Sequence, residues 1–316
     1  MKSIQWKMGC RAGLRTAWSL GKVLFPVTFL VAVLQHTPAI DWAVSLFAPV
    51  MGWIGLPGDA AIPLVLGNLL NLYAAIGAVL TMEFTVKQVF IIAVMLSFSH
   101  NLLVEGALCK KIGISFLAVS AMRLFMAFSS AGLIHLLWSG GGEVARYGLV
   151  APEEAAVSGF LPITLNALET AVTGTVQFSV VVFLLMIMIQ VLRDLRVLDF
   201  VSKKLATSMH FLGIPERGAI TMAAGLLFGL AFGAGVIIEQ AREQSFSKRD
   251  LYVMLLFLSG CHAIMEDTLL FVPLGIPVWA LLLIRVIVAI ILTVVVARIW
   301  RRRGYRSPVE AKGESM

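Results

Sequence analysis

The sequence predicts an all-α polytopic membrane protein with two inverted-topology repeats, and three observations lead to this fold class. The 316 residues are 59% hydrophobic and only 14% charged, with a mean hydropathy of +0.92. Several apolar runs reach the roughly 20 residues that a helix needs to cross a bilayer. A cluster of ionisable residues occurs twice within these runs. No β-barrel alternation is visible, so we expect helical spans, which satisfy their own backbone hydrogen bonds.

The repeated segments read LSFSHNLLVEGALCKKIGISFLAVSAMRLFMA from Leu96 to Ala127 and LSGCHAIMEDTLLFVPLGIPVWALLLIRVIVA from Leu258 to Ala289. Aligned without a gap, the ionisable pairs are His100 with His262, Glu105 with Asp267, and Arg123 with Arg285, at an offset of 162 residues (262 − 100 = 162). Identical apolar residues arise easily by chance in so hydrophobic a chain. A histidine, a carboxylate and an arginine at the same three aligned positions do not. The pattern indicates a duplication with one site at the repeat interface.

The duplication extends upstream at an offset of 158, which pairs Gly55 with Gly213 and Gly67 with Gly225 (225 − 67 = 158). Each copy has a helix, an amphipathic stretch ending in Gly-x-Pro, a Gly-rich apolar segment, a His-bearing helix and an Arg-bearing helix. The predicted spans are about 16–35, 86–108, 112–137, 168–192, 250–271 and 276–299. The predicted divisions are a first repeat at 1–137, a polar, Gly-rich outer linker at 138–167, a second repeat at 168–300 and a basic cytoplasmic tail at 301–316.

Charge decides how the Gly-rich runs 60–81 and 218–238 are placed. If both crossed the membrane, the basic cluster between 193 and 217 would lie opposite both basic termini, against the positive-inside tendency. If both are re-entrant hairpins, each copy has three crossings, the copies are inverted, and the basic loops share the cytoplasmic side. We therefore predict hairpins, with tips near Gly67, Asn68, Asn71 and Gly225. The small residues at 225–235 also fit simple helix packing.

The same charge distribution predicts the location of the protein. We expect a multi-pass protein of a prokaryotic plasma (inner) membrane with both termini cytoplasmic. The net charge of +7 lies at helix ends, so no nucleic-acid partner is expected. Cys10, Cys109 and Cys261 show no CxxC spacing and predict neither a disulfide framework nor a zinc motif. The first apolar run is long and lacks a small-x-small cleavage site, so we interpret it as a membrane helix.

Ionisable residues at membrane depth are the candidate site. A charge at the bilayer centre costs about 2.5–3.5 kcal/mol on insertion scales, so such residues face partners or a water-filled pathway. The predicted binding residues are His100, Asn101, Glu105, His262, Glu266 and Asp267, with Arg123 and Arg285 as supporting charge. His262 and Glu266 are one helical turn apart. His100 and Glu105 are five residues apart, so they converge only if the helix unwinds between them.

The residue types favour a cation. Three carboxylates and two arginines leave a charge of −1 when both histidines are neutral. Imidazole with carboxylate is the usual ligand set for borderline divalent metals, and the candidate metal ligands are His100, Glu105, His262, Glu266 and Asp267. No HExxH motif is present. Apart from a bound metal or sodium ion, no cofactor is expected. The alternative is that the polar pairs are interhelical hydrogen bonds and the arginines form structural ion pairs.

The order of these elements resembles the nucleoside-recognition (Gate) domain, which concentrative nucleoside transporters, the membrane part of ferrous-iron permeases and spore maturation proteins share. SFSHNLLVEGAL and SGCHAIMEDTLL occupy the place of the family's polar, interrupted helix, and nearly the whole chain resembles two Gate copies. The resemblance implies a polytopic fold and a small solute. The GTPase motif G-x-x-x-x-G-K-[ST] and the iron permease's cysteine motif are absent, although Cys261 stands beside His262.

Three functions follow as hypotheses. The first is a secondary transporter that moves a divalent metal or other cation by alternating access at a midplane site between the repeats. The second is an ion-coupled transporter of a nucleoside or similar polar solute, for which the polar segments offer few aromatics beyond Phe98 and Phe271. The third is a non-transporting assembly factor of the spore-maturation type. No nucleophile–base motif suggests an enzyme. The expected partners are the bilayer and the solute, and a homo-oligomer stays open.

Overall fold

The computed structural model describes residues 5–147, 159–195 and 246–302, with separate residues between 209 and 229. The described residues form helices and loops, and their one β-type pairing is an isolated bridge between Thr85 and Val144. In this part of the chain, five helical stretches are long and apolar enough to cross a membrane: Trp6–Leu34, Val86–Lys111, Phe116–Leu137, Phe160–Met188 and Val278–Arg302. The predicted all-α polytopic fold class is confirmed.

The helices follow the predicted order in the first half, and in the second half the described first helix, His-bearing helix and Arg-bearing helix do so. The first half contains α1 (Trp6–Leu34), α2 (Pro38–Gly52), η1 (Gly58–Ala60), α3 (Ala61–Leu69), α4 (Leu72–Val79), α5 (Val86–Ser99), α6 (Leu102–Lys111) and α7 (Phe116–Leu137). The second half contains α8 (Phe160–Asp194), α11 (Lys248–Cys261), α12 (Ile264–Leu269), η3 (Val272–Leu274) and α13 (Val278–Arg302).

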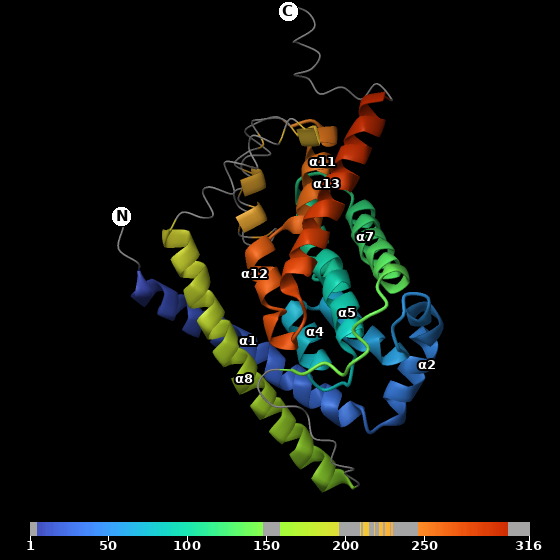
Figure 1. Ribbon diagram of the computed structural model, residues 1–316, viewed down its shortest axis with the longest axis vertical. Helices are drawn as coiled ribbons and strands as arrows, with labels where there is room; N and C mark the ends of the chain where they lie inside the picture. The colour runs from blue at the N-terminus through green and yellow to red at the C-terminus, as the bar shows by residue number, and fades with distance from the viewer. Residues whose placement is uncertain are drawn as a thin grey trace, which may run out of the picture.

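The α5–α6 stretch is largely buried inside the protein, whereas α1 and α8 lie at its periphery. The most apolar window of the α5–α6 stretch is 83% buried, against 22% for α1 and 18% for α8. Helices α1 and α8, the first helix of each repeat, lie side by side as the two long diagonal helices of Figure 1. Helices α7, α11 and α13 contact α5. The ends of α5 and α11, where the polar residues lie, are therefore surrounded by protein.

Both central helices begin in the same way. Helix α5 starts with a capping box between Thr85 and Gln88, and α11 starts with one between Ser247 and Asp250. In each box the hydroxyl of the capping residue accepts a hydrogen bond from the backbone N–H three residues later. The side chain of that later residue accepts a hydrogen bond from the backbone N–H of the capping residue. The two boxes are 162 residues apart (247 − 85 = 162). The duplication therefore fixes where both helices start, and with it where both histidines lie.

The Gly-rich run 60–81 forms two short helices that pack against each other, α3 of 9 residues and α4 of 8 residues. At 1.5 Å per residue each is about 12–14 Å long, less than half of a bilayer core. The chain turns at Leu70 and Asn71, and the Asn71 Oδ1 accepts from the Ala74 N–H at 3.0 Å. This geometry fits the predicted hairpin, whose depth in a bilayer stays a prediction. Much of 218–238 lies outside the described residues.

Several predicted boundaries differ from the structure. The segments 86–108 and 250–271 are not single continuous helices, because α5 ends at Ser99 before α6, and α11 ends at Cys261 before the 6-residue α12. Helix α8 begins at Phe160, inside the predicted linker 138–167, because apolar residues already start there. The first part of that linker lies against the start of α5, where Val86 N donates to Glu143 O at 2.9 Å. Of the predicted tail 301–316, Arg301 and Arg302 form the last turn of α13 and the remainder lies outside the described residues.

Candidate functional site

Both His-bearing helices are broken at the same step. After α5, His100 is extended (ψ 155°) and Asn101 is left-handed (φ 58°); after α11, His262 is extended (ψ 154°) and Ala263 is left-handed (φ 41°). Across the described residues, Asn101 and Ala263 are the two non-glycine residues with positive φ. That conformation costs about 1–2 kcal/mol for an L-residue, so it needs support from its surroundings. The helix is therefore unwound between His100 and Glu105, which these two residues need in order to converge.

Gly67 and Gly225, one from each Gly-rich run, supply part of this support. The Asn101 N–H donates to Gly67 O at 2.8 Å, and the Ala263 N–H donates to Gly225 O at 3.1 Å. A Cβ at Gly67 would lie 2.3 Å from a side-chain carbon of Leu96, and one at Gly225 would lie 2.6 Å from a side-chain carbon of Leu258. Glycine is therefore required for the close approach. Both glycines contact the helix breaks, although in the first repeat the chain reversal itself comes three residues later.

The two arginines bind the carbonyls at the ends of the broken helices. Arg123 donates to Phe98 O (2.7 Å) and His100 O (2.8 Å), and Arg285 donates to Gly260 O (3.3 Å) and His262 O (2.7 Å). Carbonyls at a helix C-terminus lack intrahelical donors, and a cation is favourable there. Both arginines are fully buried. Each therefore stabilises the helix end that carries the histidine of its own repeat.

The arginines hold the two carboxylates unequally. Arg123 Nη1 lies 2.7 Å from Glu105 Oε2, whereas Arg285 Nη2 lies 3.5 Å from Asp267 Oδ2. The other terminal nitrogen of Arg285, Nη1, instead donates to Thr268 Oγ1 at 2.9 Å. Glu105 is thus tightly paired within its repeat, and Asp267 is loosely paired.

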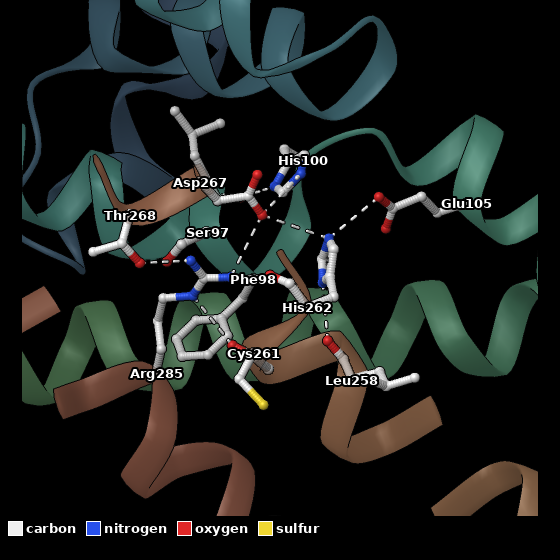
Figure 2. A network of polar contacts seen from close by, with 12 residues as sticks. Ser97, Phe98, His100, Glu105, Leu258, Cys261, His262, Asp267, Thr268 and Arg285 are labelled. Atoms are coloured by element: carbon white, nitrogen blue, oxygen red, sulfur yellow. Dashed lines mark hydrogen bonds and ion pairs between the residues drawn. The ribbon is translucent and has the colours of Figure 1, made fainter. Parts of the chain in front are cut away.

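The histidines reach across to the other repeat. His262 Nε2 lies 3.2 Å from Glu105 Oε1, and His100 Nε2 lies 3.8 Å from Asp267 Oδ2. His262 Nε2 is also 3.8 Å from the same Asp267 oxygen. The two rings stack with centroids 5.2 Å apart and planes inclined by 29°. Figure 2 shows the rings together, with Asp267 and Glu105 approaching from different sides. Residues 162 positions apart in the chain therefore converge.

Backbone contacts fix the orientation of both imidazoles. The Nδ1 atom of His100 lies 2.7 Å from Leu96 O, and that of His262 lies 2.9 Å from Leu258 O. A carbonyl oxygen can only accept, so Nδ1 carries the proton in each ring. In a neutral ring the lone pair is then on Nε2, which faces the carboxylates. Histidines that bind metals commonly have this second hydrogen bond.

The cluster is buried and incompletely bonded. The exposed fractions are 6% for His100, 3% for Glu105, 1% for His262 and 8% for Asp267. In the described part of the chain, the buried atoms His262 Nε2, Asp267 Oδ2, Glu105 Oε2 and Arg123 Nη1 meet their neighbours through ion-pair contacts of 2.7–3.8 Å. A buried cluster held mainly by ion pairs is a candidate place for a further polar partner.

The other predicted residues contribute differently. The sequence placed His262 and Glu266 on one helical face, but the break at Ala263 separates them into different helices. Glu266 is half-buried and acts electrostatically on Tyr73. Asn101 contributes its backbone N–H to Gly67.

Among the remaining hairpin residues, Asn71 caps α4. Asn68 is half-buried, and its Oδ1 finds no hydrogen-bond partner among the described residues.

Sequence reasoning missed Tyr73 and Thr268. Tyr73 lies in the first turn of α4, close enough to Glu266 and Asp267 for both carboxylates to act on its phenol. Its signal was a phenol two residues after Asn71 in an apolar run, because a buried tyrosine hydroxyl usually seeks a polar partner. Thr268 directs one nitrogen of Arg285 away from Asp267, and no pattern in the sequence marked it.

Comparison with known proteins agrees with the duplicated architecture. The family model Gate, described as nucleoside recognition, matches residues 17–125 and again residues 175–277. YvoD, an uncharacterized membrane protein of Bacillus subtilis (strain 168), is 50% identical over 294 residues, which cover 93% of this chain and 94% of that protein. No solved structure matches. Both family matches include the histidine and the carboxylate of the site. The chain therefore belongs to the Gate (nucleoside recognition) family of membrane proteins, with two copies of the domain.

Proposed function

We propose that this protein is a secondary transporter that moves a small cation, with a divalent metal as the first candidate, by alternating access between its two repeats. One observation carries the proposal: the histidine of each broken helix faces a carboxylate of the other repeat inside the protein. Transporters with internal repeats commonly place their binding site at the repeat interface, on discontinuous helices. The site joins both halves, so a movement of one half against the other changes it directly.

The charges of the cluster favour a cation as the solute. Glu105, Glu266 and Asp267 carry three negative charges against the two positive charges of the arginines, which leaves −1 with neutral histidines. Both arginines already donate to helix-end carbonyls, so little of their donor capacity is left for an anionic solute. The lone pairs of the two imidazoles are turned towards the cluster. A cation therefore finds acceptors on several sides.

The contacts at the two breaks supply the gates in this proposal. The Gly67 carbonyl is bonded to the first break and the Gly225 carbonyl to the second, so each Gly-rich segment contacts one broken helix in this conformation. Release of one contact at a time would open the site from one side at a time. The inverted orientation, the plasma membrane location and the cytoplasmic termini belong to the proposal and are supported by the distribution of basic residues.

A nucleoside or similar polar solute is the second candidate. The description of the family favours it, and so does Tyr73, whose phenol lies within reach of the charges of Glu266 and Asp267. Phe98 and Phe271 are fully buried in the hydrophobic core, which leaves Tyr73 as the aromatic for stacking in the described site. Loss of a stacked base costs about 1–3 kcal/mol, so Tyr73→Ala would lower nucleoside flux by about 5–150-fold. Cation flux that survives this change would exclude nucleoside stacking on Tyr73.

Flux measurements on purified protein in liposomes test the proposal. Entrapped metal indicators and radiolabelled nucleosides report uptake by the parent protein, by Glu105→Gln and by Asp267→Asn, with the exposed Glu83→Gln as the control. We expect cation uptake that both site variants abolish while size-exclusion profiles stay monodisperse and the control stays active. If the parent moves no solute and the site variants only lose their fold, the cluster is structural and a membrane assembly factor is the better assignment.

A further inference from the structure

We propose that the site binds a divalent first-row transition metal, such as Zn²⁺, Fe²⁺ or Co²⁺, through three atoms: His100 Nε2, His262 Nε2 and Asp267 Oδ2. This inference rests on the proposed function, because it names the class of cation and its ligands. It assigns different roles to the two carboxylates, since Glu105 supplies negative charge beside a ligand and Asp267 is a ligand. It also excludes Mg²⁺, Ca²⁺ and Na⁺ as the preferred ions.

The separations of the three atoms fit one ion. They all lie within 4.8 Å of one another, and both histidine nitrogens are 3.8 Å from the Asp267 oxygen. Two ligands that are each about 2.0–2.2 Å from a metal lie at most about 4.2–4.4 Å apart. The distance of 3.8 Å is too long for a hydrogen bond but suits two atoms that share a metal. Binding of one ion requires the two nitrogens to come within the same limit.

The ligand atoms are already oriented. Each Nδ1–H is bonded to the carbonyl four residues earlier, on the last turn of α5 or α11, so each ring presents its Nε2. This contact fixes the tautomer that metal binding requires. The carbonyls of both histidines are in turn bound by Arg123 and Arg285. The backbone of both ligands is therefore held at each helix end before any ion arrives.

Two buried atoms are left for the ion to satisfy. His262 is 1% exposed, and its Nε2 lies 3.2 Å from Glu105 Oε1, an acceptor to which a neutral ring with its proton on Nδ1 cannot donate. Asp267 Oδ2 has a long contact of 3.5 Å with Arg285 and contacts of 3.8 Å with the two histidines. Both atoms face the same space as His100 Nε2 (Figure 2). A metal would supply the missing partner for both.

The two carboxylates are distinguished by their arginines. Glu105 is drawn towards Arg123 at 2.7 Å and approaches His262 Nε2 with its other oxygen at 3.2 Å. It lies outside the three-atom group, and it places negative charge beside the His262 nitrogen that would bind the ion. Asp267, 3.5 Å from Arg285, keeps an oxygen for the ion. The resulting set contains one histidine from each repeat and a single carboxylate from the second.

This ligand set selects a chemical class. Imidazole suits zinc, iron, nickel and copper, whereas magnesium and calcium prefer oxygen ligands throughout. Three protein ligands leave at least one position of a tetrahedral ion open. An open position lets water or an approaching ligand exchange, which suits an ion that must be released. A structural zinc site, by contrast, has four closed ligands.

The test uses the full chain, purified in detergent and stripped of metal. Equilibrium dialysis with Zn²⁺, and the visible absorption of bound Co²⁺, measure affinity and stoichiometry. We expect one ion per chain that a hundredfold excess of Mg²⁺ or Ca²⁺ does not displace. Loss of an outer-sphere partner of a metal ligand typically costs about 10–100-fold, so loss of a ligand should cost at least tenfold. His100→Ala, His262→Ala and Asp267→Asn should show this loss. His36→Ala, an exposed histidine at the end of α1, is the matched control.

X-ray absorption by Zn²⁺ bound to the parent protein keeps the test independent of variant folding. It should show two imidazole nitrogens and one oxygen at about 2.0–2.2 Å, with water completing the shell. A shell without imidazole, or equal affinity in His262→Ala and His36→Ala, overturns the inference. Histidine-dependent binding without flux in liposomes upholds the metal site and refutes transport. Cation flux that is unaffected in His262→Ala upholds transport and refutes this ligand set.

Discussion

The unequal pairing of the two arginines predicts unequal effects when they are replaced. Arg123→Met keeps an unbranched apolar side chain but removes both bonds to helix-end carbonyls and the 2.7 Å contact with Glu105. The Glu105 carboxylate, 3% exposed, then keeps its 3.2 Å contact with His262 but has lost its arginine. Removing one member of a buried ion pair costs about 3–5 kcal/mol. We expect a loss of unfolding free energy in that range.

A double-mutant cycle isolates the ion pair from the helix-end bonds. Glu105→Gln combined with Arg123→Met should show a coupling energy of about 2–3 kcal/mol, near the upper end for residues in contact. The equivalent cycle of Asp267→Asn with Arg285→Met should give about 1 kcal/mol or less, because that ion pair is 3.5 Å long. The arginines bind equivalent carbonyls in both repeats, so the second cycle is the internal control for the first.

Unfolding of the purified protein in mixed micelles, by titration with sodium dodecyl sulfate and with circular dichroism as the readout, measures both cycles. Arg123→Lys should lie between the parent and Arg123→Met, because lysine keeps the charge but lacks the planar fork that reaches two carbonyls and a carboxylate together. Equal coupling energies in the two repeats would refute the assignment of Glu105 as the tightly held carboxylate. An Arg123→Met variant with an unchanged free energy of unfolding would refute it as well.

Further substitutions test the helix breaks. Gly67→Ala and Gly225→Ala place a Cβ 2.3 and 2.6 Å from a leucine, so each should lose about 1–3 kcal/mol in the same assay. Gly132→Ala, with nothing within 4 Å, should leave stability unchanged or raise it by up to about 1 kcal/mol. Ala263→Val places a β-branched residue at φ 41° and should destabilise by about 1–2 kcal/mol or more, whereas Ala263→Gly should not destabilise. Thr268→Ala frees the arginine that Thr268 binds, so it should weaken Zn²⁺ binding in equilibrium dialysis while it changes stability by about 1 kcal/mol. Unchanged binding would show that Thr268 has no part in the site.

The sequence predicted the duplicated residues because ionisable side chains are rare and costly within membrane segments. His100 and His262 could be paired by spacing alone, and the requirement for an unwound helix followed from the five-residue step to Glu105. The unwinding itself had no local signal at Ala263, since alanine rarely adopts positive φ. It depends on the Gly225 carbonyl, which is brought to the break by tertiary packing.

The exchange of partners between repeats was beyond sequence reasoning for a related reason. Helical periodicity placed His262 beside Glu266, which holds only while one helix continues through both. The left-handed Ala263 ends that periodicity and turns His262 towards Glu105. Which carboxylate it reaches depends on how α11 packs against α5 and α7. Helical periodicity describes residues within one helix, so it cannot predict this packing between segments that are far apart in the chain.

The difference between the repeats explains how two equivalent clusters form one site. Thr268 occupies the position equivalent to Gly106 (268 − 106 = 162). In the first repeat no side chain at that position competes for Arg123, and the arginine pairs closely with Glu105. In the second repeat the Thr268 hydroxyl accepts from Arg285, and the ion pair with Asp267 is longer. One substitution in a duplicated frame thus leaves one carboxylate neutralised and the other available, which suits a single ion shared by two histidines.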